Sequence, residues 1–151
     1  MMWEITEYTE EDLDAAVDLI EAFHVEHLAT VSPAFCRESV LGTVERIAAI
    51  GTSKILLLRK DGVSVGIAAA VATPSIFNAS SLEFTELVWY IVPEFRSRGI
   101  MLYKRLLAEA ADMGVEYVRM AYVHNDVKEK VAAFFRSEGF RECETHCVKK
   151  L

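Results

Sequence analysis

This chain of 151 residues lacks long apolar runs and paired cysteines. No apolar run approaches the roughly 20 residues that a membrane-spanning helix needs, and Ile55–Leu58 and Val65–Ala72 have the length of strands. The three cysteines include no Cys-x-x-Cys pair, so they predict no disulfide framework. Cys143 and Cys147 would lie about 13 Å apart along a strand, which is too far for a disulfide bond.

Basic residues are the minority, with 16 Lys and Arg against 23 Asp and Glu and a net charge of −7. This balance argues against general nucleic-acid binding, which needs a basic face. It suits a cationic substrate such as an amine, or it serves only solubility. The N-terminus carries Glu4 and Glu7 in place of the basic and apolar regions of a signal peptide, so we expect a cytoplasmic protein.

What the chain does have is an ordinary globular composition, with 52% hydrophobic and 26% charged residues. It contains no repeat, low-complexity tract or linker, and its length suits one hydrophobic core. We therefore expect residues 1–151 to form a single domain.

The first half predicts two helices between strands. Thr9 and Asp12 form a capping-box-like start for the first helix, and Ser32-Pro33 is predicted to open a second helix that ends at Gly51. The Asp61-Gly62 pair predicts a hairpin turn. The strands expected around these features are Trp3–Tyr8, Lys54–Arg59 and Val63–Val71.

The second half begins with a loop over 73–81 and a central strand. Gly114 and Gly139 are predicted to end two helices, the second of which is capped by Asn125 or Asp126. The predicted elements are a strand Leu82–Val92, a helix Leu102–Met113, a strand Tyr117–Val123, a helix up to Gly139, and closing strands Phe140–Cys143 and His146–Lys149. The order β-α-α-β-β-β-α-β-α-β-β favours an α/β or α+β fold.

The segment 92–101 predicts an anion site. A β-branched and aromatic strand ends at Pro93, two arginines and Gly99 follow, and a helix begins. Amides at a helix N-terminus favour negative charge, and arginines add charge-assisted donors. An exposed loop with incidental arginines is the alternative.

This segment resembles the acyl-CoA-binding motif Arg/Gln-x-x-Gly-x-Gly/Ala of the GCN5-related N-acetyltransferase (GNAT) family. Arg96, Gly99 and Ile100 fit, whereas Met101 occupies the place of the second Gly/Ala. The segment 134–140 resembles the family's Phe/Leu-Tyr-x-x-x-Gly-Phe, with Phe135 where tyrosine is usual. The resemblance covers essentially the whole chain, and it implies a mixed, mostly antiparallel sheet of six or seven strands flanked by four helices.

The resemblance also implies an N-acetyltransferase that transfers an acetyl group from acetyl-CoA to a primary amine of a small molecule or peptide. Amides from Arg96 to Met101 would face the pyrophosphate, and the backbone of the preceding strand would face the pantetheine. The cofactor-binding residues expected on this basis are Ile91, Val92, Arg96, Ser97, Arg98, Gly99, Ile100, Met101, Asn125 and Phe135. The methionine adds bulk where glycine would let a phosphate approach.

Glu86 is the predicted general base. A carboxylate inside a central strand is costly unless it is paired or used. The alternatives for Glu86 are a structural salt bridge and a role that orients substrate without moving a proton. Glu83, three residues earlier, is predicted to point to the opposite face of the sheet. Phe135 cannot donate a proton to a leaving thiolate, so Tyr122 or His124 is predicted to do so, unless the thiolate leaves unassisted.

Two groups of residues that contain histidine are considered as metal ligands. His24 and His27 lie one turn apart without a third ligand, and His146 and Cys147 would face opposite ways on a strand, so no metal site is predicted. Besides the enzyme, the sequence allows a catalytically impaired GNAT-fold binding or regulatory protein, or a sensor that never binds coenzyme A. The acceptor stays undetermined from the sequence, and a homodimer is possible.

Overall fold

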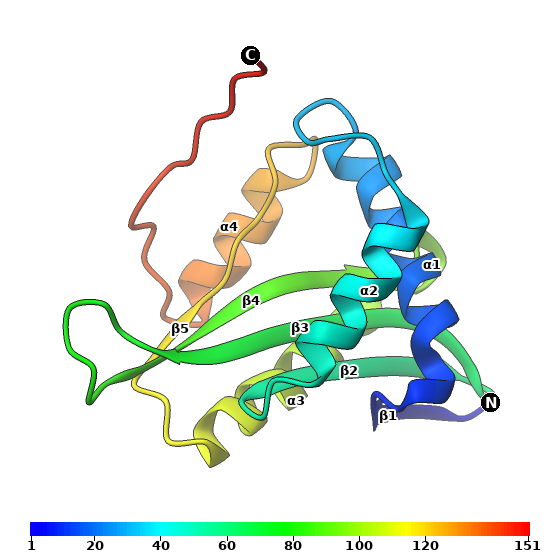
Figure 1. Cartoon of the computed structure of the whole chain (residues 1–151), viewed down its shortest axis with the longest axis horizontal. Helices are drawn as coiled ribbons and strands as arrows, with labels where there is room; N and C mark the ends of the chain where they lie inside the picture. The colour runs from blue at the N-terminus through cyan, green and yellow to red at the C-terminus, as the bar shows by residue number, and fades with distance from the viewer.

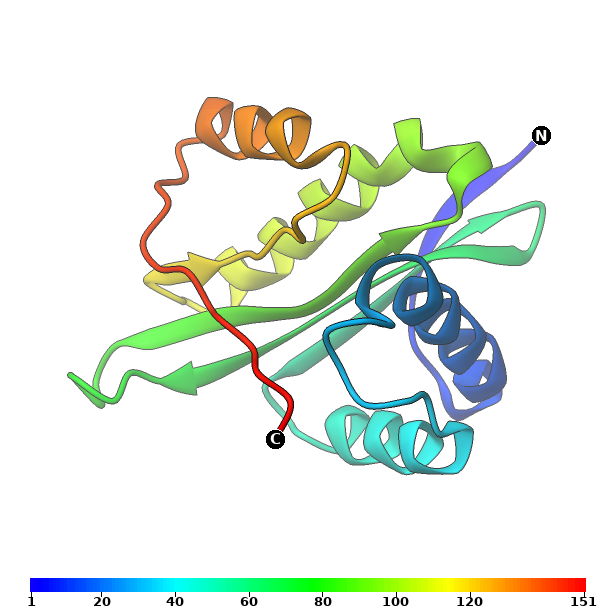
Figure 2. The same cartoon turned by 90° about the horizontal axis from the view of Figure 1, so that it is seen from above.

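One sheet separates two pairs of helices, as Figures 1 and 2 show. The structure, a computed structural model, describes residues 1–151. The strands are β1 (Trp3–Glu7), β2 (Ser53–Lys60), β3 (Val63–Pro74), β4 (Leu82–Ile91) and β5 (Tyr117–Arg119). The helices are α1 (Leu13–Phe23), α2 (Arg37–Ala48), α3 (Gly99–Asp112) and α4 (Lys128–Ser137). None of them is long and apolar enough to cross a membrane.

The five strands lie in the order β1-β2-β3-β4-β5. Neighbours from β1 to β4 are antiparallel, and β5 is parallel to β4. The predicted mixed, mostly antiparallel sheet with four helices is therefore confirmed, although it has five strands and not six or seven. The hairpin turn is also confirmed, because Asp61 and Gly62 have positive φ angles of 50° and 82°.

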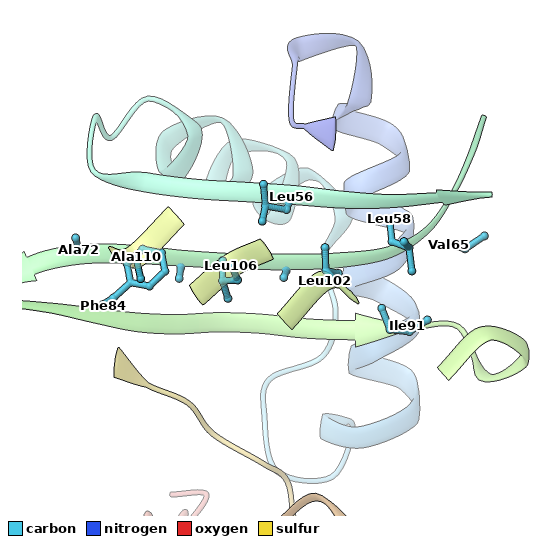
Figure 3. Close-up of a cluster of buried hydrophobic side chains, with 11 residues drawn as sticks. Leu56, Leu58, Val65, Ala72, Phe84, Ile91, Leu102, Leu106 and Ala110 are labelled. Atoms are coloured by element: carbon cyan, nitrogen blue, oxygen red, sulfur yellow. The ribbon is translucent and has the colours of Figure 1, made fainter. Parts of the chain in front are cut away.

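Each face of the sheet carries its own hydrophobic core, which explains the nearly continuous apolar runs of β2 and β3. On one face, Leu102, Leu106 and Ala110 of α3 pack on alternate strand residues (Figure 3). On the other face, α1 and α2 cover the remaining strand residues. The strand residues of this second core are Ile55, Leu57, Ile67, Ala69, Val88 and Tyr90.

The expected boundaries of the second helix were wrong. The helix begins at Arg37 and not at Ser32-Pro33, because the Ser32 hydroxyl donates to the carbonyl of Leu28 at 2.8 Å and so completes the preceding turn. Residues 24–28 continue α1 as a π-helical turn. The Thr9 start is confirmed, since its amide donates to the Asp12 carboxylate at 2.9 Å.

The end of the chain also differs from expectation. β5 stops at Arg119 instead of Val123, and the predicted closing strands over 140–143 and 146–149 do not form. All residues from 141 to 151 are exposed. A three-residue β5 offers a short outer edge, and the closing segment is too polar to bury a face of its own.

Candidate active site

β4 and β5 pair only at their beginning and then separate. The parallel ladder runs from Glu83 opposite Tyr117 to Thr85 opposite Arg119, while β4 continues to Ile91. In Figure 2 the chain after β5 leaves the sheet and rises to α4. The outer edge of β4 from Glu86 onward is therefore free of a neighbouring strand, which opens a split in the sheet.

A β-bulge lies where the split begins. Ala69 of β3 pairs with Val88, and the next residue, Ala70, pairs with Glu86, so Leu87 is an extra residue in β4. A bulge disrupts the ladder locally and re-aims side chains. Here it falls beside the residue predicted to be the general base.

Glu86 is half-buried on the same face as Ala70, which belongs to the α3 core. No Lys or Arg forms an ion pair with it, so the structure rules out the salt bridge that was one of its alternative roles. Loss of water around the carboxyl group raises its pKa to about 7, although an amide hydrogen bond from Ala121 opposes this rise. Ala121 lies in the segment that follows β5.

Glu83 differs from Glu86 in both direction and partner. Its carboxylate accepts two hydrogen bonds from Arg119, at 3.1 and 3.3 Å, and this pairing lowers its pKa. Because side chains alternate along a strand, it lies on the face opposite Phe84, a member of the α3 core. The predicted difference in orientation between the two glutamates is confirmed.

A 3-10 turn, Pro93–Arg98, connects β4 to α3. The Val92 amide donates to the carbonyl of Val65 at 3.0 Å, which fixes the end of β4 to β3. Gly99, the first residue of α3, is buried, and a Cβ there would lie 3.3 Å from Ile91 Cγ1 and 3.6 Å from Trp89 Cζ2. A side chain at this position would crowd Ile91, so the glycine favours close packing of the helix on the strand.

Arg96 is turned away from the start of α3. Its guanidinium pairs with the carboxylate of Glu26, in the π-helical turn, and its Nε donates to the carbonyl of Ile91 at 3.4 Å. Burial raises the pKa of Glu26, but hydrogen bonds from Arg96 and Tyr90, together with the charge of Arg96, outweigh burial and lower that pKa. The predicted anion-binding arginine is therefore already partnered within the protein.

The remaining residues of the turn lie at the surface. Arg98 is exposed, with its guanidinium 5.1 Å from the Trp3 ring and Nη1 4.0 Å from the Met101 sulfur. Ser97 and Ile100 are exposed, and Met101 is half-buried. Arg98 has no carboxylate partner, so it is the cation of this turn that can accept an outside anion.

The arrangement can be compared with solved structures. A predicted acetyltransferase from Clostridium acetobutylicum with acetyl-CoA superposes with a TM-score of 0.77 at 14% identity, over 99% of this chain and 96% of that one. The chain has the GCN5-related N-acetyltransferase fold. No family model and no curated protein matches the sequence.

Two further structures have the GNAT fold over the full length of this chain. AAC(6')-Iy in complex with the bisubstrate analogue CoA-S-monomethyl-acetylneamine has a TM-score of 0.75 at 17% identity, covering 100% and 99% of the two chains. Glucosamine-6-phosphate N-acetyltransferase from Arabidopsis thaliana has a TM-score of 0.75 at 13% identity, covering 99% of each. At identities this low, the structural likeness establishes the fold of this chain and nothing further.

The two predicted acids lie on the segment that leaves β5. Tyr122 stacks on Phe135, with ring centroids 6.1 Å apart, and its hydroxyl donates to the Glu142 carboxylate, which raises the pKa of the tyrosine. His124 is exposed. Phe135 is buried, and its ring packs against Trp89 of β4 and Phe134 of α4. Phenylalanine carries no proton to donate.

Asn125 has two contacts. Its side-chain oxygen accepts from the Val127 amide at 3.0 Å, and its amide nitrogen lies 3.2 Å from His27 Nδ1. The predicted cap was wrong, because the N-cap of α4 is Val127 and no side chain caps the helix. His27 in turn lies 3.4 Å from Glu26. The turn at the end of α1 therefore contacts both segments that border the split, the one after β4 and the one after β5.

The sequence did not reveal Glu26 or the bulge. Neither a partner 70 residues away nor an unpaired strand residue leaves a periodic signal.

The histidines considered as metal ligands have other contacts. His24 Nε2 lies 2.9 Å from both the Ser32 hydroxyl and the Pro33 carbonyl, and His146 lies 3.2 Å from Glu144. The structure contains no group of three or more His, Cys, Asp or Glu residues placed to hold a metal ion. Cys36, Cys143 and Cys147 are free and exposed.

Proposed function

We propose that this protein is an N-acyltransferase that moves an acetyl group from acetyl-CoA to a primary amine. The observation that carries the proposal is Glu86, a half-buried carboxyl group without a cationic partner, with a pKa of about 7, at the point where the sheet opens. A base is most useful when its pKa is near the working pH. The GNAT fold and the neighbours bound to acetyl-CoA or a coenzyme A analogue support the choice of donor.

The residues around the split fit the donor. The free edge of β4 up to Ile91 offers peptide groups to an extended amide chain, and the N-terminal amides of α3 with exposed Arg98 offer donors to a pyrophosphate. Acetyl-CoA, when bound, would supply an acyl thioester from which the acetyl group is transferred as the thiol departs. The other residues expected to bind the cofactor here would contribute backbone groups. They are Val92, Ser97, Gly99, Ile100 and Met101.

Glu86 would take the proton that the amine must lose before or as its nitrogen attacks. The carbon-nitrogen bond forms while the carbon-sulfur bond breaks, and the departing sulfur needs one proton from an acid or from water. Tyr122 already donates to Glu142, whereas His124 is exposed; both stay predictions as the acid. Phe135 is excluded by its chemistry.

The first test measures acetyl-CoA binding and turnover separately. Acetyl-CoA at millimolar concentration should raise the melting temperature, because only a ligand of the native state stabilises it. Thiol release from acetyl-CoA should then increase when propylamine or another simple amine is added. Thiol release that is the same with and without amine would overturn the transferase assignment.

A second function on this scaffold is acyl-CoA binding without catalysis. Met101 in the turn and Phe135 in the wall both depart from the family pattern, and both would be tolerated in a protein that binds but does not turn over. Binding without amine-dependent thiol release would favour this function. We also expect Met101→Gly to tighten acetyl-CoA binding, since it removes bulk from the start of α3.

A further inference from the structure

An apolar cavity lies on the side of the sheet opposite α3. It has a volume of about 230 Å³ and lies between α1, α2 and the strands. Ten of its eleven lining residues are hydrophobic, and the remaining one is Thr43. The lining residues are Ile20, Phe23, Val40, Thr43, Val44, Ile47, Ile55, Ile67, Ala69, Leu87 and Val88.

This cavity opens to solvent beside the bulge. Leu87 is 44% exposed and Thr43 is exposed, so these two residues form its rim, whereas Val44, Ile67 and Ala69 are buried at its floor. Leu87 and Val88 are consecutive and yet both line the cavity, because the bulge breaks the alternation of β4. The cavity rim is thus one residue along the chain from Glu86.

The edge of β4 is accessible from both faces of the sheet at this point. β5 no longer covers the edge of β4 at Glu86, and α3 with its N-terminal turn lies on the face away from the cavity (Figure 2). A donor held at α3 and an acceptor held in the cavity would therefore approach the edge of β4 from opposite faces. Their reacting groups would meet near Glu86.

We propose, on the basis of the transferase function, that the acceptor is a primary amine with a compact apolar substituent of about six to eight carbons, and that this substituent occupies the cavity. No charged side chain lines the cavity, and desolvating the charges of a polyamine or a sugar phosphate there would be costly. A cavity of about 150 Å³ lined by apolar side chains holds a benzene molecule, so 230 Å³ accommodates a hexyl or phenethyl group.

The experiment compares kcat/KM for propylamine, hexylamine, phenethylamine, butane-1,4-diamine and glucosamine with acetyl-CoA as donor. Burial of each methylene is expected to raise kcat/KM about fourfold, so hexylamine should exceed propylamine by about 60-fold. The diamine and the amino sugar should fall below hexylamine. Thr43→Phe, which narrows the rim, should remove most of the chain-length dependence. Glu38→Gln, exposed on the same helix and outside the cavity, should preserve it.

A rate that is independent of chain length, or highest for the diamine or glucosamine, would overturn the inference and leave the transferase function standing. A preference for hexanoyl-CoA over acetyl-CoA with propylamine would overturn it too, because the cavity would then hold the acyl chain. If no amine is acetylated, the transferase function fails. The cavity is then tested by melting temperature, which should rise more with hexylamine than with propylamine in the wild type and not in Thr43→Phe. Equal shifts would overturn the inference.

Discussion

β4 has a paired half and an open half, and the two halves treat the same side chain differently. In the paired half, Glu83 accepts two hydrogen bonds from Arg119, and its pKa falls. In the open half, no cation pairs with Glu86, and loss of water raises its pKa to about 7. The residue type is identical and the separation is three residues, so the neighbours of each carboxyl group decide its protonation.

The two glutamates suit different roles within one strand, Glu83 a structural role and Glu86 the proposed proton transfer. An ionised, ion-paired carboxylate is a poor base because its proton affinity is low, whereas a carboxyl group with a pKa near 7 both accepts and returns a proton near neutral pH. The paired half holds β5 to the sheet, and the open half leaves edge and carboxyl group accessible to ligands. Each prediction below changes one half and asks whether the other stays unaffected.

The largest effect is expected for Glu86→Gln. The amide keeps the shape of the side chain but cannot take a proton, so amine-dependent thiol release should fall by about 10²-fold or more. Glu83→Gln is the matched control on the same strand, and its rate should stay within a few-fold of wild type. Steady-state kinetics with acetyl-CoA check both variants. Equal losses in the two would show that Glu86 acts through the structure of the strand and not as a base.

The next effect concerns pH and stability. The pKa of Glu86 in the folded state is about 7, above its ordinary value of 4.5. Its contribution to stability is therefore fully present below pH 4.5 and is lost as the pH rises through 7. Between these limits the wild type should lose up to about 3 kcal/mol of unfolding free energy relative to Glu86→Gln. Urea titrations from pH 4.5 to 8 measure this difference. Parallel curves for the two proteins would place the pKa elsewhere.

The control for that experiment runs in the opposite direction. Arg119 lowers the pKa of Glu83, so the contribution of Glu83 is present above its unfolded pKa and is lost as the pH falls through the folded value. Glu83→Gln should therefore be less stable than wild type at neutral pH, and this difference should disappear as the pH falls. If the proposed transfer reaction occurs, kcat/KM of the wild-type protein should rise with pH through an inflection near 7 that Glu86→Gln lacks.

A smaller effect separates the two arginines at the open end of the strand. Arg98→Ala should weaken acetyl-CoA binding about tenfold, because it removes one charge-assisted donor to a phosphate. Arg96→Ala should alter that affinity less but lower the melting temperature, since Glu26 loses its partner. Titration calorimetry and thermal melts check the pair. A larger loss of affinity in Arg96→Ala would mean that Arg96 leaves Glu26 when the donor binds.

The smallest effect is expected in the paired half. Arg119→Gln removes an ion pair at the surface, where such pairs contribute little, so the melting temperature should fall by less than about 3 °C. The difference should shrink in high salt. Kinetics should be unchanged, and a large loss of activity would mean that the paired half also positions the site.

Much of the fold was predictable because it rests on local signals. The Asp61-Gly62 turn, the Thr9 cap and the run of helices and strands follow from residue types at fixed spacing. The GNAT resemblance of the turn before α3 supplied the sheet topology that order alone left open. The start of α2 was missed because Ser32 satisfies the helix before it and not the one after it.

The site was predictable in its residues more than in its contacts. Glu86 stood out as a carboxylate in an apolar strand, yet its isolation from cations is a property of the folded surroundings. The partner of Arg96 is Glu26, 70 residues earlier in the chain, and no local pattern predicts such a pair. The cavity under α2 likewise depends on how two helices seat on the sheet, which periodicity does not specify.

Leu87, the unpaired residue of the bulge, is not needed for the arrangement of helices on the two faces of the sheet. Phe84, Glu86, Trp89 and Ile91 already share one phase if the extra residue is skipped, so removing it would restore a regular ladder without inverting the faces of the strand. Architecture and chemistry are therefore separable at a single position. Deletion of Leu87 would thus change the course of β4 beside Glu86 while the helices on both faces keep their places on the sheet.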